Sequence, residues 1–109
     1  MDKTRTIASV MNALSHPRRI ALFDILEEAG PKGVGFESLL KSTKFTATTL
    51  RHHLRPMQAA GLVIRRREGV NVIFRLHGRE AQSVTEDLTR RLSRIPPAAK
   101  PRAEPPPLN

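Results

Sequence analysis

Apolar residues recur at helical spacing in the first third of the chain. Those at positions 7, 10, 11 and 14 form one stripe on a predicted helix over about residues 4–14. A second helix is predicted from Pro17 to Ala29, because Ser15 or His16 can cap it and proline fits the first helical position. Its buried side is expected to carry Ile20, Leu22, Phe23, Ile25 and Leu26.

A turn-rich break over residues 30–35 precedes two further predicted helices, and Val34 suits a brief strand within it. Residues 36–41 are enough only for a short helix. Thr46 is a good N-cap for a longer helix over about residues 47–60, with Gly61 just past its end. A short helix, a tight turn and a longer helix make the helix-turn-helix arrangement.

Pro56 interrupts the pattern of the longer helix. Inside a helix it removes the hydrogen bond to the carbonyl of His52 and crowds that turn, at a cost of ~3 kcal/mol unless the helix bends. We expect either a kink or break near residues 52–56 or a separate short helical turn that begins at Pro56.

Two β-prone runs, residues 62–64 and 72–76, follow Gly61 and flank a predicted turn over residues 67–71 that contains Gly69. Helical periodicity then returns over residues 79–95, with Ala81, Val84, Leu88, Leu92 and Ile95 on one side. The predicted order is α-α-α-α-β-β-α. This is a mainly α architecture with a small β-hairpin (α+β), a winged helix-turn-helix with an extra helix at each end.

The chain is predicted to hold one domain, residues 1–95, followed by a disordered, proline-rich tail over residues 96–109. A domain of this size buries only ~60% of its unfolded surface, so oligomerisation would stabilise it. The absence of cysteine excludes disulfides and thiolate metal sites and favours a cytoplasmic location. No signal peptide and no apolar run of the ~18 residues that a membrane span needs is found.

Positive charge is concentrated in the centre of the chain. Residues 44–79 contain eight Lys or Arg and one acid, which accounts for seven of the nine net positive charges. Each phosphate that such a surface neutralises releases condensed counterions and strengthens binding. The charge therefore predicts double-stranded DNA as the partner of this segment.

Three ordered motifs resemble the ArsR/SmtB-type winged-helix transcriptional repressors. Residues 12–22 are similar to the family's entry into its second helix, "ALxxPxRLxIL". Residues 50–63 resemble its recognition-helix pattern, "VSxHLxxLxxAGLV", and residues 66–76 resemble its wing. Together the motifs cover about residues 7–95.

The resemblance implies a homodimer that binds an inverted-repeat operator and is released by a small-molecule effector, often a metal ion. It also implies that the first and last helices form the dimer interface, which agrees with their apolar stripes. The alternative is that these stripes pack only within one subunit. The predicted interface residues are Ile7, Val10, Met11, Leu14, Val84, Leu88, Leu92 and Ile95.

The early turns of the second helix of a helix-turn-helix enter the major groove, so its outward residues are the candidates for DNA contact. They are Thr46, Thr48, Thr49, Arg51, His52 and Arg55, with Arg65, Arg66, Arg67 and Arg75 on the wing. Arg51 suits a bidentate contact to guanine, worth ~1–3 kcal/mol of discrimination. Leu50, Leu54 and His53 are expected to face the core. An ordinary solvated helix face is the alternative for the outward residues.

A metal site is not predicted, and neither is a cofactor. Residues 34–39 have no cysteine, and His77 is the only histidine near Glu80, Glu86 and Asp87. No nucleophile–base pair or phosphate-binding glycine motif points to an enzyme. The predicted function is a sequence-specific, dimeric transcriptional repressor. The alternative is a winged-helix domain that binds nucleic acid without sequence preference or serves protein assembly.

Overall fold

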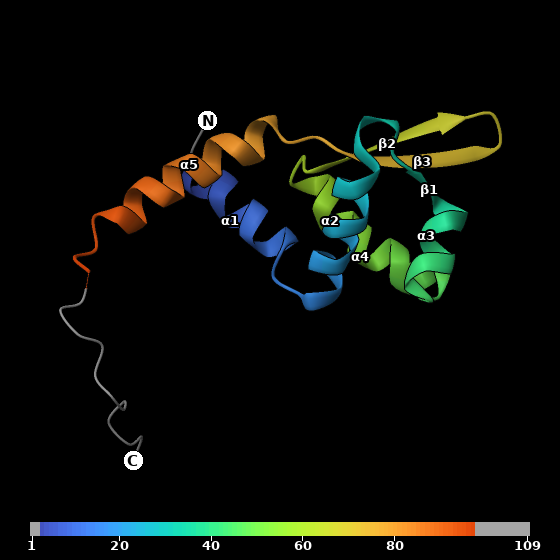
Figure 1. Cartoon of the computed structure of the whole chain (residues 1–109), viewed down its shortest axis with the longest axis horizontal. Helices are drawn as coiled ribbons and strands as arrows, with labels where there is room; N and C mark the ends of the chain where they lie inside the picture. Colours follow the sequence, from blue (N-terminus) through green and yellow to red (C-terminus); the bar gives the residue numbers. More distant parts are fainter. Residues whose placement is uncertain (1–2, 98–109) are drawn as a thin grey trace, which may run out of the picture.

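The computed structural model describes residues 3–97, apart from the side chains of Lys3 and Glu80. These residues form helices and a small antiparallel sheet whose hairpin extends beyond the helices (Figure 1). The elements in chain order are α1 (Lys3–Ala13), α2 (Pro17–Ala29), the 3-10 turn η1 (Gly30–Lys32), β1 (Val34–Gly35), α3 (Phe36–Thr43), α4 (Ala47–Ala59), β2 (Val63–Glu68), β3 (Asn71–Leu76) and α5 (Arg79–Ser93) (Figure 1). This order confirms the predicted winged helix-turn-helix. Most of the predicted tail, residues 98–109, lies outside the described residues.

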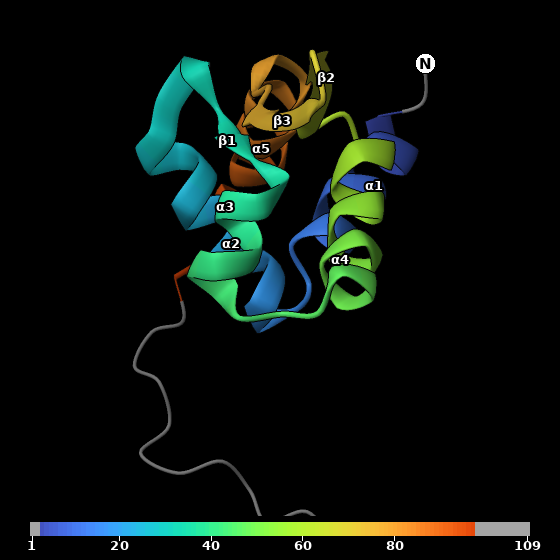
Figure 2. The ribbon, with the colours of Figure 1, turned by 90° about the vertical axis from the view of Figure 1, so that its right-hand side faces the viewer.

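The local signals in the sequence explain where α2 and α4 begin. His16, rather than Ser15, caps α2, and its Nδ1 accepts the backbone N–H of Arg18 at 3.1 Å. Thr46 caps α4 as predicted, and its hydroxyl accepts the N–H of Thr49 at 3.1 Å. Figure 2 shows the resulting pair of helices, α3 and α4, joined by a short turn.

Pro56 lies inside α4, which continues without a break from Ala47 to Ala59. The predicted break and the predicted separate turn are therefore both wrong, while the predicted kink stays a prediction. Pro56 removes one interior hydrogen bond of the helix, the one to the carbonyl of His52, and α4 continues for one more turn after it. The carbonyl of Pro56 itself accepts the N–H of Ala60 at 3.0 Å, which closes that last turn.

The predicted hairpin is present, but its strands are longer than the apolar pattern suggested. β2 pairs with β3 from Val63↔Leu76 to Glu68↔Asn71, so the turn contains only Gly69 and Val70. Gly69 has φ +62°, while Val70 does not have a positive φ, which is the pattern of a type II′ hairpin turn. β1 adds a third strand beside β3, with the order β1-β3-β2.

The core lies between α4, the sheet and the other helices. Its largest fully buried side chains are Leu22, Leu26, Leu39, Leu50, Leu54, Met57 and Val10. The expectation that Ile20 is buried is wrong, because its side chain is 42% exposed. Leu22 and Leu26 are one helical turn apart and define the inner face of α2, and Ile20 lies on another face.

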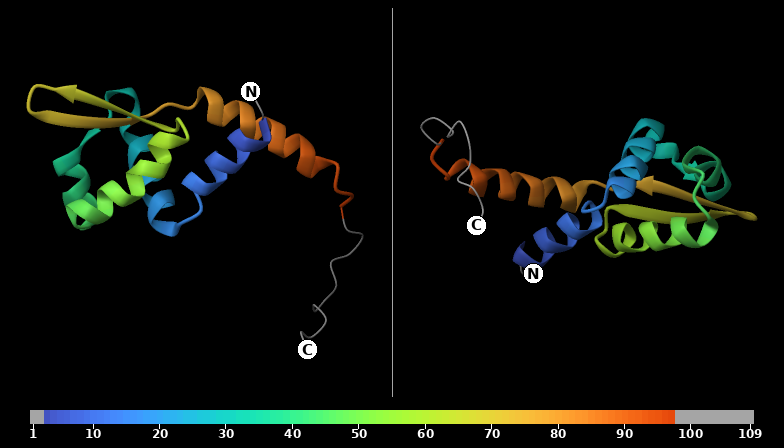
Figure 3. Two further views of the ribbon diagram at one scale, coloured as in Figure 1. Left: turned by 180° about the vertical axis from the view of Figure 1, so that it is seen from behind. Right: turned by 90° about the horizontal axis from the view of Figure 1, so that it is seen from below.

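α1 and α5 lie side by side at the end of the molecule opposite to the wing, the hairpin β2–β3 (Figure 3). Part of the predicted interface stripe is buried within this one chain, namely Ile7, Val10 and Val84. Met11, Leu92 and Ile95 remain exposed, at 42%, 56% and 63%. No helix within residues 3–97 has both the length and the apolar character that crossing a membrane requires.

Candidate nucleic-acid interface

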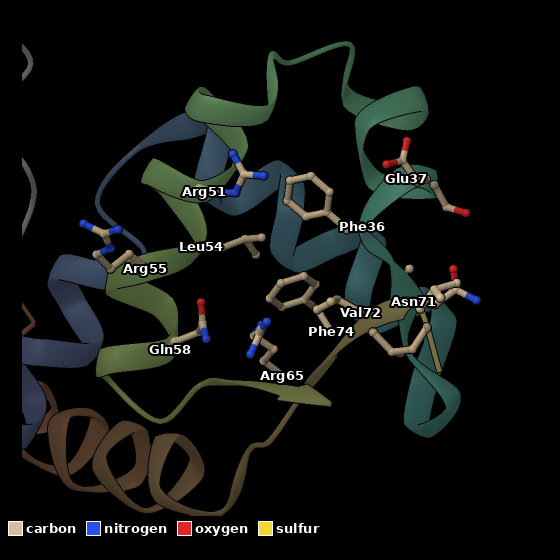
Figure 4. Close-up of a pocket in the computed structure, with 14 residues that line it drawn as sticks. Phe36, Glu37, Arg51, Leu54, Arg55, Gln58, Arg65, Asn71, Val72 and Phe74 are labelled. Atoms are coloured by element: carbon tan, nitrogen blue, oxygen red, sulfur yellow. The ribbon is translucent and has the colours of Figure 1, made fainter. Parts of the chain in front are cut away.

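A groove of about 640 Å³ separates α4 from the wing and the start of α3. Its floor is apolar, with Leu54, Phe36 and Phe74, and the rings of the two phenylalanines are 6.2 Å apart between centroids (Figure 4). Arginine and amide side chains line its walls, namely Arg51, Arg55 and Gln58 from α4 and Arg65 from β2. The acid Glu37 at the start of α3 and Asn71 at the start of β3 also border it. The groove therefore joins the two segments that the sequence predicted to contact DNA.

Arg51 is held beside the groove by an aromatic ring rather than by a carboxylate. Its guanidinium carbon is 5.1 Å from the centroid of the Phe36 ring, within the range of a cation–π contact. The ion pairs found among the described residues do not include Arg51. Its side chain is exposed, so its charge and its hydrogen-bond donors are free for a ligand.

The four predicted wing arginines divide between the two faces of the hairpin. Residues directly opposite each other on paired strands share a face of the sheet. Arg65 is opposite Phe74, so it lies on the face that continues from the core toward the groove, and Arg67, two residues on, lies on the same face. Arg66 lies on the other face, where its Nη2 pairs with Glu68 Oε2 at 2.6 Å. Arg75 is opposite Ile64 and is half-buried on that same outer face.

The remaining predicted residues of α4 lie on its other side, away from the wing. Thr48 and His52 are exposed, and Thr49 is half-buried. The three line a shallow hollow together with His16, Arg18 and Arg19 of α2. The hydroxyl of Thr46 is engaged as the cap of α4 and also lies 3.0 Å from the Thr49 hydroxyl.

His53 is buried, with 4% of its surface exposed, as expected for a core-facing residue. Its Nδ1 accepts a hydrogen bond from Arg19 Nε at 3.3 Å, and Arg19 Nη1 donates to the carbonyl of Asn12 at 2.7 Å. Arg19 thus ties α4 to the end of α1. Nothing in the sequence indicates this role, although Arg18 and Arg19 form a basic pair at a helix start.

The surroundings of His53 lower its pKa below the ordinary value of 6.5. Burial is the largest cause, followed by the positive charges of His16, Arg19, His52 and Arg18. The neutral ring is also the form that can accept the hydrogen bond from Arg19. The fold therefore holds His53 neutral.

His53 should make the fold less stable at mildly acidic pH. Its folded-state pKa lies below 6.5, so the unfolded chain binds more protons than the folded chain as pH falls through this window. The stability that His53 contributes is thus complete above about pH 6.5 and decreases below it. Urea unfolding at pH 7.5 and 5.5 should show a smaller difference for His53→Gln than for the unmodified protein.

His52→Gln should reduce the pH dependence less than His53→Gln, because His52 is only one of the groups whose positive charge lowers the pKa of His53. An equal pH dependence in His53→Gln and the unmodified protein would contradict the assignment.

No group of three or more His, Cys, Asp or Glu within residues 3–97 is arranged to hold a metal ion.

No family model and no curated protein matches the sequence, but solved structures match the fold. An ArsR-like transcriptional regulator from Rhodococcus sp. RHA1 is 29% identical, with a TM-score of 0.68, over 82% of this chain and 79% of that chain. The homodimeric winged helix-turn-helix DNA-binding domain of a possible ArsR-family regulator from Mycobacterium bovis is 25% identical. Its TM-score is 0.65, over 83% of this chain and 80% of that one.

HlyU from Vibrio cholerae N16961 shares the fold at 23% identity, with a TM-score of 0.64 over 85% of this chain and 99% of that chain. The fold and its helix–wing groove define a winged helix-turn-helix domain. The predicted resemblance to ArsR-type transcriptional regulators is confirmed by these neighbours.

Proposed function

We propose that the chain is a sequence-specific, DNA-binding transcriptional regulator, and that the groove between α4 and the wing holds one strand of the duplex. The observation that carries this proposal is the set of arginines on both walls, Arg51 and Arg55 on α4 and Arg65 on β2, with no carboxylate paired to them among the described residues. An α-helix fits the major groove, and the phosphate backbone then passes beside it, within reach of the wing.

The proposed contacts follow from the position of each side chain. Arg51 and Arg55 reach base edges or phosphates from α4, and Thr48, Thr49 and His52 contact DNA from its other side. Arg65 and Arg67 bind flanking phosphates from the wing. Arg66 and Arg75 contribute less, since they lie on the outer face and Arg66 is paired with Glu68. Thr46 acts mainly as the helix cap.

The active form is proposed to be a homodimer that acts as a repressor in the cytoplasm. Met11, Leu92 and Ile95 support this, because they leave apolar surface exposed on α1 and at the end of α5. The solved Mycobacterium bovis domain is homodimeric. The interface would also take in Leu14 and Leu88, while Ile7, Val10 and Val84 support it from beneath. A two-fold dimer presents two recognition helices, which suits an inverted-repeat operator.

Fluorescence anisotropy with the DNA upstream of the chain's own gene would test this function. At ~150 mM salt we expect tighter binding to that DNA than to a scrambled duplex, because nonspecific binding is almost wholly electrostatic. Equal binding to both duplexes would favour a domain that binds nucleic acid without sequence preference. No binding to either duplex would favour a role in protein assembly.

Arg51→Ala should weaken binding to the specific duplex by about 5- to 150-fold, which corresponds to the ~1–3 kcal/mol of one bidentate base contact. Binding to the scrambled duplex should fall much less. Gel filtration should show an unchanged dimer, since Arg51 lies on α4, away from α1 and α5. An equal loss on both duplexes would reduce Arg51 to a phosphate contact.

A further inference from the structure

The start of α2 lies against the side of α4 that faces away from the wing. The hollow between them is lined by His16, Arg18, Arg19, Thr48, Thr49 and His52, with His53 beneath. The rings of His16 and His53 are 4.8 Å apart between centroids, which places the α2 start directly beside the recognition helix. This surface is separate from the groove on the wing side.

The two arginines of this hollow differ in how their charges are used. Arg19 is half-buried and already donates hydrogen bonds within the protein, from Nε to His53 and from Nη1 to the carbonyl of Asn12. Arg18 is exposed, and its guanidinium carbon is 5.3 Å from the centroid of the Phe45 ring. That ring restrains the Arg18 side chain without neutralising its charge or using its donors.

The described residues pair no carboxylate with Arg18. Neither α2 nor α4 has an acidic residue in its first turn. The first acid of α2 is Asp24, two helical turns after its start. The hollow therefore presents uncompensated positive charge beside exposed hydroxyl and imidazole groups.

We propose that Arg18 binds a DNA phosphate on the side of α4 opposite to the wing, with Thr48 and His52 beside it. An α-helix with its side chains is about 10–12 Å across, and the major groove is about 12 Å wide, so a helix in that groove has a phosphate backbone at each edge. The wing-side arginines hold one backbone, and Arg18 holds the other. This inference rests on the proposed DNA-binding function and extends it to α2.

The salt dependence of binding tests the assignment, because each phosphate contact contributes about 0.9 to the slope of log affinity against log salt. Arg18→Gln should weaken binding to the upstream and the scrambled duplex alike, by about tenfold at 50 mM salt and about threefold at 200 mM. Arg94→Gln is the matched control, since Arg94 caps α5, whose C-terminal end points away from the wing (Figure 1). Its salt slope should equal that of the unmodified protein.

Arg18→Lys keeps the positive charge but replaces the guanidinium that lies over the Phe45 ring. This variant should retain the salt slope of the unmodified protein. The inference is overturned if Arg18→Gln keeps the full slope, or if Arg18→Lys loses as much slope as Arg18→Gln. Thermal unfolding of each variant checks that the fold is intact. If the unmodified protein binds neither duplex, the proposed function is wrong. If the unmodified protein binds DNA but Arg18→Gln binds it equally well, the proposed function stands and only the role of Arg18 is wrong.

Discussion

The double variant Arg55→Gln/Arg65→Gln should bind any duplex about a hundredfold more weakly than the unmodified protein. Each arginine lines the groove from one wall, and a hydrogen bond to a charged group contributes ~1.5–3 kcal/mol, or at least about tenfold per residue. The losses add where each arginine contacts a phosphate of its own. Anisotropy titrations at 100 mM salt with upstream and scrambled duplexes would measure both.

Arg66→Gln/Arg75→Gln removes the same net charge from the outer face of the wing and is the matched control. Because Arg66 is already paired with Glu68 and Arg75 is half-buried, we expect a loss below about fivefold, mostly from long-range electrostatics. Similar losses in the two double variants would mean that total charge, rather than the groove, determines binding.

Gly33→Ala should lower the free energy of unfolding more than Gly30→Ala, the same substitution three residues earlier. Gly33 has φ +75° and ψ −172°, a backbone region that is essentially restricted to glycine and costs other residues ~1–3 kcal/mol. A Cβ at this position would lie 2.5 Å from the carbonyl oxygen of Phe74 and 2.8 Å from Ile73 Cγ2. Relieving that overlap must move β3, at a further cost of ~1–3 kcal/mol.

Gly30→Ala isolates the backbone contribution. Gly30 has a similar conformation, with φ +71° and ψ −154°, and an added Cβ would have no atom within 4 Å. We expect it to lower the free energy of unfolding by ~1–3 kcal/mol and Gly33→Ala to lower it by roughly twice as much. Thermal or urea unfolding would compare them. Equal losses of unfolding free energy in the two variants would show that β3 accommodates the extra methyl group with no further loss of stability.

Local signals predicted the helices well where they were chemically distinctive. The threonine that caps α4, the proline at the start of α2 and the glycine in the hairpin each meet a backbone requirement that favours few residue types. Other details depend on packing that no single residue specifies. Ile20 is apolar but exposed because the direction of the core from α2 is set by the elements that surround it.

The length of the wing was underestimated for a related reason. Arg65, Arg66, Arg67 and Glu68 have no apolar alternation, yet backbone pairing with β3 keeps them in a strand. Pro56 does not end or divide α4, since its local penalty is outweighed by the packing of α4, whose Leu54 and Met57 are both fully buried.

The candidate site was predicted from the sequence as a set of residues but not as a surface. Charge density pointed to residues 44–79, and the exposed arginines of α4 and the wing lie there. The cluster around His53 joins residues 34 positions apart, which a local pattern does not reveal. For that reason the sequence alone does not indicate the positions of Arg18 and Arg19 beside α4.

The register of the wing determines which of its arginines are available. Within β2, neighbouring side chains point to opposite faces, so Arg65 and Arg67 form one set and Arg66 and Glu68 form the other. Deleting Arg65 would remove one positive charge and turn Arg66 and the acid Glu68 to the groove side and Arg67 to the outer face. The DNA affinity of such a chain would depend on whether each arginine occupies an odd or an even position along β2. The amino-acid composition contains no information about that position.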